Sequence, residues 1–221
     1  MTIQTPEQIP TPIFSGFLET ADGTLRAGEP TRAEIGRPEW WFASDVVGEG
    51  FRPPQSSETY LLVRFAFSLT PPPNCEVEQA QLSAQLTCAG TDAKPVVFDL
   101  FPREILEESK NDVKVKLEPS LKLEEVEAKI GSIEATIHML KVDPIITTAG
   151  VGLANPIWSY KKHRRHPIIG TRMAYAIIGY PSSAQNMTVK LALNANVSGR
   201  YGLWPLRIPS TADAQLTHVI P

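Results

Sequence analysis

The chain has 221 residues and a mass of 24.3 kDa, with 42% hydrophobic residues, 20% charged residues and a formal net charge of −3. This balance excludes an intrinsically disordered chain, which has fewer apolar residues and a larger net charge. The glycines follow no fixed period and only two cysteines occur, which excludes collagen-like and disulfide-scaffold proteins. We expect a globular protein, long enough to bury a core without disulfide or metal staples.

The start of the chain indicates the compartment. The first twelve residues carry three prolines and lack both a basic start and an apolar run, so we expect no secretory signal. The longest apolar run, near residues 173–180, is far shorter than the ~20 residues that cross a bilayer. We predict a cytoplasmic protein without a transmembrane segment. Cys75 and Cys88 fit either two reduced thiols or one disulfide, and the sequence leaves both open.

The first 57 residues predict an irregular N-terminal arm. They contain seven prolines and six glycines and show little periodicity, apart from one expected strand at residues 40–47. Apolar side chains in this arm, such as Phe14 and Phe17, suit docking on a neighbouring subunit. We place the domain boundary after residue 57, so that residues 58–221 form the main domain.

From residue 58 onward, apolar and polar residues alternate with a period of two, which is typical of β-strands with one buried face. The expected strands cover residues 60–69, 80–86, 96–100, 113–117, 126–130, 133–137, 157–161, 171–179 and 187–197. A Gly131-Ser132 turn would join two of them as a hairpin, and residues 101–110 predict a short helical turn. The fold class is therefore all-β: an antiparallel β-sandwich (or barrel) of about nine or ten strands, with one helical turn and a proline-rich arm.

Charge is distributed unevenly along the chain. Residues 1–128 have a net charge of −10, whereas residues 129–221 have a net charge of +7. This polarity favours either an anionic partner for the basic part or head-to-tail self-association. The alternative is that strands from the two parts interleave in the fold and their charges cancel.

A run of six basic or titratable residues follows the expected strand 157–161 and overlaps its end. The run consists of Lys161, Lys162, His163, Arg164, Arg165 and His166. In a loop, this run would concentrate positive charge where an anionic ligand or an anionic membrane surface meets it. The alternative is a solvated hairpin tip that prevents edge aggregation. A single basic loop on an acidic protein does not indicate a dedicated nucleic-acid binder.

Three tryptophans define a second candidate site. Trp40 and Trp41 are adjacent on an expected strand, so their side chains point to opposite faces and one of them can line a groove. Glu39 would add a carboxylate, and Trp158 would complete a ligand pocket. The tetrapeptide at residues 39–42 resembles the Glu-Trp-Trp-Tyr motif of the lipocalin-like carotenoid hydratase family over four residues, and we transfer no activity from it. The alternative is that the tryptophans only plug one end of the sandwich.

The sequence contains no nucleophile elbow, zincin motif, Walker sequence or paired zinc-ligand motif, and we expect no cofactor and no metal. We predict a non-catalytic interaction module that binds protein or self-assembles as a homo-oligomer. One alternative is a ligand-binding or enzymatic β-barrel with the tryptophan-lined pocket. A second alternative is an anion-binding or membrane-surface-binding protein that uses the basic run.

Overall fold

The computed structural model describes residues 10–20, 31–47, 55, 57–105, 113–117, 133–137, 145–163, 168–201 and 204–220. Its strands are β1 (Pro12–Phe17), β2 (Glu19–Thr20), β3 (Arg32–Gly36), β4 (Glu39–Phe42), β5 (Glu58–Thr70), β6 (Cys75–Ala89), β7 (Val96–Phe101), β8 (Glu104–Ile105), β9 (Val113–Leu117), β10 (Ile133–Ile137), β11 (Ile145–Ala149), β12 (Ile157–Lys161), β13 (Gly170–Pro181), β14 (Asn186–Tyr201) and β15 (Trp204–Ile220). The helix α1 spans Ala43–Val47.

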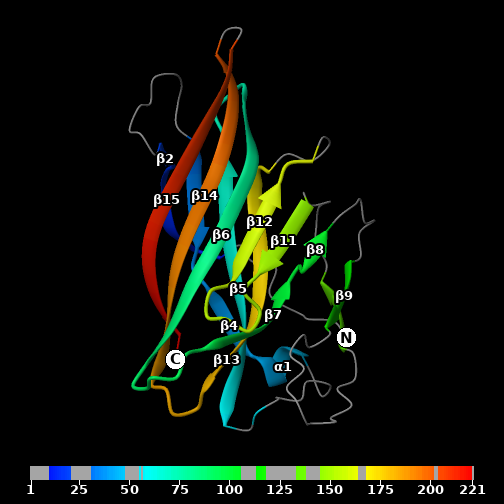
Figure 1. The fold of residues 1–221 in the computed structure, drawn as a ribbon, viewed down its shortest axis with the longest axis vertical. Helices are drawn as coiled ribbons and strands as arrows, with labels where there is room; N and C mark the ends of the chain where they lie inside the picture. The colour runs from blue at the N-terminus through cyan, green and yellow to red at the C-terminus, as the bar shows by residue number, and fades with distance from the viewer. Residues whose placement is uncertain are drawn as a thin grey trace.

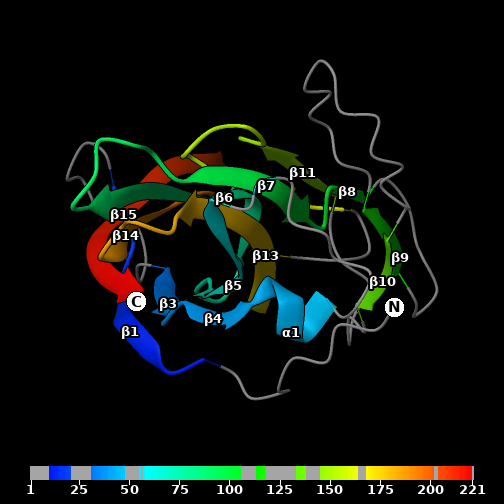
Figure 2. The same cartoon turned by 90° about the horizontal axis from the view of Figure 1, so that it is seen from below.

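These strands form an elongated sandwich of two antiparallel sheets (Figures 1 and 2). One sheet has six strands in the order β1-β3-β5-β13-β7, with β4 also pairing with β5. The other has seven strands in the order β2-β15-β14-β6-β12-β11-β8. A separate two-stranded sheet contains β9 and β10. The predicted all-β antiparallel sandwich is confirmed.

The core lies between the two sheets because both of them present a row of apolar side chains inward. β5 contributes Leu61, Val63, Phe65, Phe67 and Leu69, which alternate along one face of the strand. β6 and β14 contribute facing rows from the second sheet. A smaller core lies on the outer face of the six-stranded sheet, where α1 covers Tyr60, Leu62 and Ile177.

The predicted strand at residues 40–47 is wrong in its second half. The strand ends at Phe42, and Ala43–Val47 form the helix α1 instead. Ala43 and Val46, one helical turn apart, both pack against the smaller core. A spacing of three residues brings both side chains to one face only in a helix, so burial of this pair favours the turn of helix over a longer strand.

The predicted helical turn at residues 101–110 is also wrong in its described part. Glu104 and Ile105 form β8 and pair with Thr147 and Ile146 of β11. The open edge of β11 supplies backbone partners here, which outweighs the helix propensity of the segment. The first strand of the predicted Gly131-Ser132 hairpin lies outside the described residues. Residues 133–137 pair with β9.

The chain crosses from one sheet to the other between β7 and β8, and a buried carboxylate fixes this crossover. The Asp99 side chain is 1% exposed and accepts hydrogen bonds from Arg103 Nε at 2.9 Å and Nη2 at 3.0 Å. The Phe101 carbonyl accepts a hydrogen bond from Trp158 Nε1 at 3.2 Å. The Arg103 carbonyl accepts one from Thr148 at 2.9 Å. These contacts join both sheets at one short segment.

Candidate functional site

One end of the sandwich gathers several connections between strands, and we call it the hairpin end. β1, β5, β12 and β14 end there, and β3, β6, β13 and β15 begin there. The β14–β15 hairpin projects beyond the six-stranded sheet at this end (Figure 1). The ends of these strands therefore lie at one end of the sandwich.

The six-stranded sheet ends here in a cross-strand row, which we call the terminal row. It consists of Phe17, Arg32, Thr70 and Ile169. Gly170 pairs with Leu69, so Ile169, the residue before Gly170, comes level with Thr70. Leu69 faces the inter-sheet core, so the adjacent terminal row faces outward. Phe17 is 59% exposed and Ile169 is 48% exposed, which leaves two large apolar side chains in solvent.

Arg32 adds a cation to this row. Its guanidinium donates hydrogen bonds to Glu34 at 2.8 Å and to Ser15 at 3.2 Å. The Arg32 side chain is still 58% exposed. The terminal row therefore combines apolar and cationic groups on one exposed strip.

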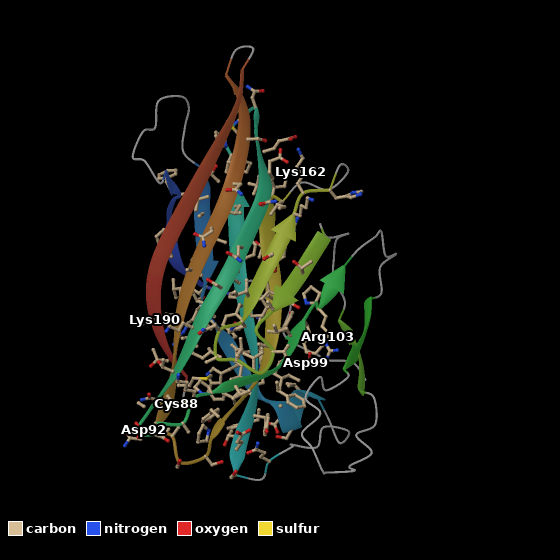
Figure 3. The ribbon with its side chains drawn as sticks, viewed as in Figure 1. Cys88, Asp92, Asp99, Arg103, Lys162 and Lys190 are labelled. Atoms are coloured by element: carbon tan, nitrogen blue, oxygen red, sulfur yellow. The ribbon has the colours of Figure 1, made fainter. Side chains whose placement is uncertain are left out.

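The basic run divides into parts with different surroundings. Lys161 is exposed at the end of β12. Lys162, at the upper end in Figure 3, forms ion pairs with Glu76 and with Glu78, the latter at 3.2 Å. These carboxylates raise the pKa of Lys162, and they also neutralise its charge locally. His163 is half-buried.

The remaining members of the predicted basic site, Arg164, Arg165 and His166, lie outside the described residues. The run as an anion-binding or partner-binding site stays a prediction. Among the described members of the run, Lys161 is the one that is exposed. Lys162 is held by Glu76 and Glu78, so it contributes much less to the field at the hairpin end.

The tip of the β14–β15 hairpin is aromatic in sequence. The two strands remain paired up to Tyr201 and Trp204, and residues 201–204 read Tyr-Gly-Leu-Trp. This register places both aromatic residues at the last paired position before the turn. Tyrosine and tryptophan are the residues most enriched where protein meets the polar region of a bilayer.

The predicted tryptophan-lined pocket is not assembled from the described residues. Trp158 is completely buried between the sheets, where it packs on Phe65 with ring centroids 5.3 Å apart. Trp40 packs against the main core and Trp41 against the smaller core. The expectation that these two side chains lie on opposite faces matches this packing, and it also separates them. A ligand-binding role for them stays a prediction.

Glu39 has a structural partner in Arg64. The Arg64 side chain is 1% exposed and donates from Nε to the Glu39 carboxylate at 2.7 Å, with a second hydrogen bond from Nη2. The guanidinium carbon also lies 5.4 Å from the centroid of the Trp41 ring. A buried arginine requires such partners, so Glu39 and Trp41 are engaged in satisfying it.

The sequence pointed to Phe17 as an exposed apolar group but missed Ile169. Ile168 and Ile169 are adjacent, and Ile168 is fully buried. Adjacent residues in extended backbone point to opposite sides, so two consecutive isoleucines at a strand start indicate that one of them faces outward. This alternation could have been used to predict from the sequence that Ile168 or Ile169 is exposed.

Within the described ranges, no three His, Cys, Asp or Glu residues come together in a way that would hold a metal ion. Cys75 and Cys88 are free, and burial raises the pKa of the Cys88 thiol. Among the described residues, no helix has the length and apolar character needed to cross a membrane.

The chain matches no family model and no curated protein sequence. Among solved structures it is similar to one described as a pore forming protein, with 9% identity, a TM-score of 0.39, and coverage of 87% of this chain and 92% of the other. It is also similar to the Clostridium perfringens NetB toxin in the membrane inserted form, with 6% identity, a TM-score of 0.37, and coverage of 92% and 93%. A third similar structure is Clostridium perfringens delta-toxin, with 8% identity, a TM-score of 0.41, and coverage of 91% of each chain.

Two predictions from the sequence are wrong against these comparisons. The similar structures are described as pore-forming or toxin proteins, in contrast to the predicted non-catalytic protein-interaction module. They also contrast with the predicted cytoplasmic location. TM-scores and identities this low transfer no activity to this chain. The predicted homo-oligomer and the predicted lack of a nucleic-acid partner stay predictions.

Proposed function

We propose that this chain is a membrane-surface-binding protein that contacts the bilayer with its hairpin end. The observation that carries the proposal is the terminal row, in which exposed Phe17 and Ile169 lie at the two ends and Arg32 and Thr70 lie between them. Large apolar side chains exposed on one edge of a fold are candidates for membrane or protein contact.

The charges at the same end favour a lipid surface over a purely apolar partner. Lys161 is an exposed cation at the hairpin end, and a cation near an anionic leaflet contributes about 1 kcal/mol of attraction. Arg32 is 58% exposed but is paired with Glu34, so it contributes less than that. Tyr201 and Trp204 add aromatic residues at the hairpin tip. Cationic side chains suit the anionic head groups of a membrane, aromatic residues suit the interface, and apolar side chains suit the hydrocarbon region below it.

The test is cosedimentation with vesicles of phosphatidylcholine, with and without phosphatidylserine. The variant Phe17→Ser/Ile169→Ser removes two half-exposed apolar side chains from the terminal row. Their transfer free energy is about 2 kcal/mol in total, so binding is expected to weaken about thirtyfold. Phosphatidylserine is expected to strengthen binding of the unaltered protein at low salt.

Leu153 provides the matched control because it is 60% exposed in the β11–β12 connection, at the opposite end of the sandwich. The variant Leu153→Ser is expected to bind vesicles as the unaltered protein does. Failure of the unaltered protein to sediment with either vesicle contradicts the proposal. An equal loss in the Leu153 variant and the double variant contradicts the assignment of the hairpin end.

A further inference from the structure

A groove of about 360 Å³ lies on the outer face of the seven-stranded sheet. Strands β11, β12, β6 and β14 form its floor, and their outward side chains form its walls. The terminal row belongs to the other sheet, so the groove is a separate site. Its chemistry differs as well, because six of its ten described lining residues carry a side-chain amide or an aliphatic hydroxyl, beside Ala80, Tyr160 and Ala195 of the floor.

The sheet register brings four of these polar side chains into one line. Thr147 pairs with Ser159, Ser159 pairs with Gln81, and Gln81 pairs with Asn194. Paired residues project to the same face, so two hydroxyls and two amides cross the groove in a row. Neighbouring strands lie about 4.8 Å apart, which spaces these groups evenly over about 14 Å.

A second polar pair lies two residues along the strands. Asn196 pairs with Gln79, and its Nδ2 donates a hydrogen bond to Gln79 Oε1 at 3.1 Å. This bond orients both amides and leaves each with further donor or acceptor capacity. Lys161 is the single charged side chain among the described residues that line the groove.

The lining selects for a neutral ligand that carries many hydroxyl groups. About 25% of the residues in a typical soluble domain are charged, whereas the described residues of the groove supply one ammonium and no carboxylate. Amides and hydroxyls both donate and accept hydrogen bonds, which is the capacity that sugar hydroxyls complement. Among the described lining residues, a charged ligand would find only Lys161 as a counter-charge.

The polar strip continues beyond the groove along β6. Its outward positions from Gln79 to Thr87 are all uncharged, and they alternate with the buried core residues of the same strand. A single sugar ring would contact only part of this strip. The length of the strip therefore favours an extended chain of linked rings.

We propose that the groove binds a neutral polysaccharide, with the row from Thr147 to Asn194 making hydrogen bonds to its hydroxyl groups. This inference does not rest on membrane binding. The ligand is soluble, and the residues that contact it lie outside the terminal row.

The test is native affinity electrophoresis in gels that contain dextran, laminarin or galactomannan. The unaltered protein is expected to migrate more slowly in at least one polysaccharide gel than in a gel without polysaccharide. The variant Gln81→Ala/Asn194→Ala removes both amides of the row and is expected to raise the apparent Kd about tenfold or more. A second variant, Thr147→Lys, places a long charged side chain in the groove from an exposed position and is expected to abolish retardation.

The matched control is Ser183→Ala/Gln185→Ala, which removes two exposed polar side chains from the β13–β14 connection, outside both the groove and the strip along β6. It is expected to keep at least half of the retardation. Far-UV circular dichroism and thermal unfolding check that every variant is folded. The inference is overturned if no polysaccharide retards the unaltered protein. It is also overturned if the groove variants and the control variant are retarded equally.

Discussion

Asp99 is expected to make the stability of the fold depend on pH, and Asp99→Asn removes that dependence. Burial raises the pKa of the Asp99 carboxyl to about 6 from its ordinary value of 3.8, although Arg103 and the Leu100 N–H act in the opposite direction. The folded protein therefore binds this proton more tightly than the unfolded chain does. Stability from this group increases as the pH falls through 6 and is lost again as the pH rises.

The size of the effect follows from the two pKa values. A difference of about two units between the folded and unfolded pKa corresponds to about 3 kcal/mol of folding stability. This stabilisation is fully present only below pH 3.8. Between pH 7 and pH 5 the folded state gains about 1.4 kcal/mol from this carboxyl. That change is a sizeable fraction of the stability of a typical domain.

Urea unfolding of the unaltered protein and of Asp99→Asn at pH 7, 6 and 5 measures this quantity. The difference between the two unfolding free energies is expected to shift by about 1.4 kcal/mol in favour of the unaltered protein as the pH falls. Asp92→Asn is the control, because Asp92 is an exposed carboxyl near the same strand (Figure 3). A constant difference between pH 7 and pH 5 would refute the reasoning.

Two further predictions concern the buried arginine and a tight turn. Glu39→Gln leaves Arg64 buried beside a neutral amide, and urea titration is expected to show an unfolding free energy lower by about 2 kcal/mol. Glu34→Gln, which removes an exposed ion pair with Arg32, should cost less than about 1 kcal/mol in the same titration. Gly150→Ala is expected to lower the melting temperature by several degrees, because a Cβ there would lie 2.3 Å from a backbone oxygen at a φ of +107°. At Gly170 a Cβ would meet nothing within 4 Å, so Gly170→Ala should be milder, and equal shifts would contradict the steric argument.

The alternation of apolar and polar residues predicted the central strands well. In β5, β6 and β14 one face packs against the opposite sheet, so burial imposes a period of two on the sequence. β15 was missed because Pro205 and Pro209 interrupt its pattern. β15 pairs with β14 along its length and, among the described residues, with the two residues of β2 on its other side, so it is close to an edge strand. Edge strands tolerate proline because one side of the ladder lacks a partner.

The candidate sites were harder to predict because they depend on partners distant in sequence. The sequence marked Glu39 as a ligand-binding carboxylate, but it cannot show that Arg64 is buried beside it. It marked Lys162 as part of an exposed basic run, but Glu76 and Glu78 hold that lysine from the start of β6. Only the strand register, which pairs β6 with β12, brings these charges together.

The order of strands in the two sheets also governs how the chain can fold during synthesis. β5 and β6 are consecutive in sequence, yet they belong to different sheets and do not pair with each other. β5 requires β13, and β6 requires β12 and β14, all of which leave the ribosome much later. Two long strands therefore emerge with unpaired edges and exposed apolar faces. Completion of the sandwich is expected to be late and slow, with a need for chaperone protection until the C-terminal strands arrive.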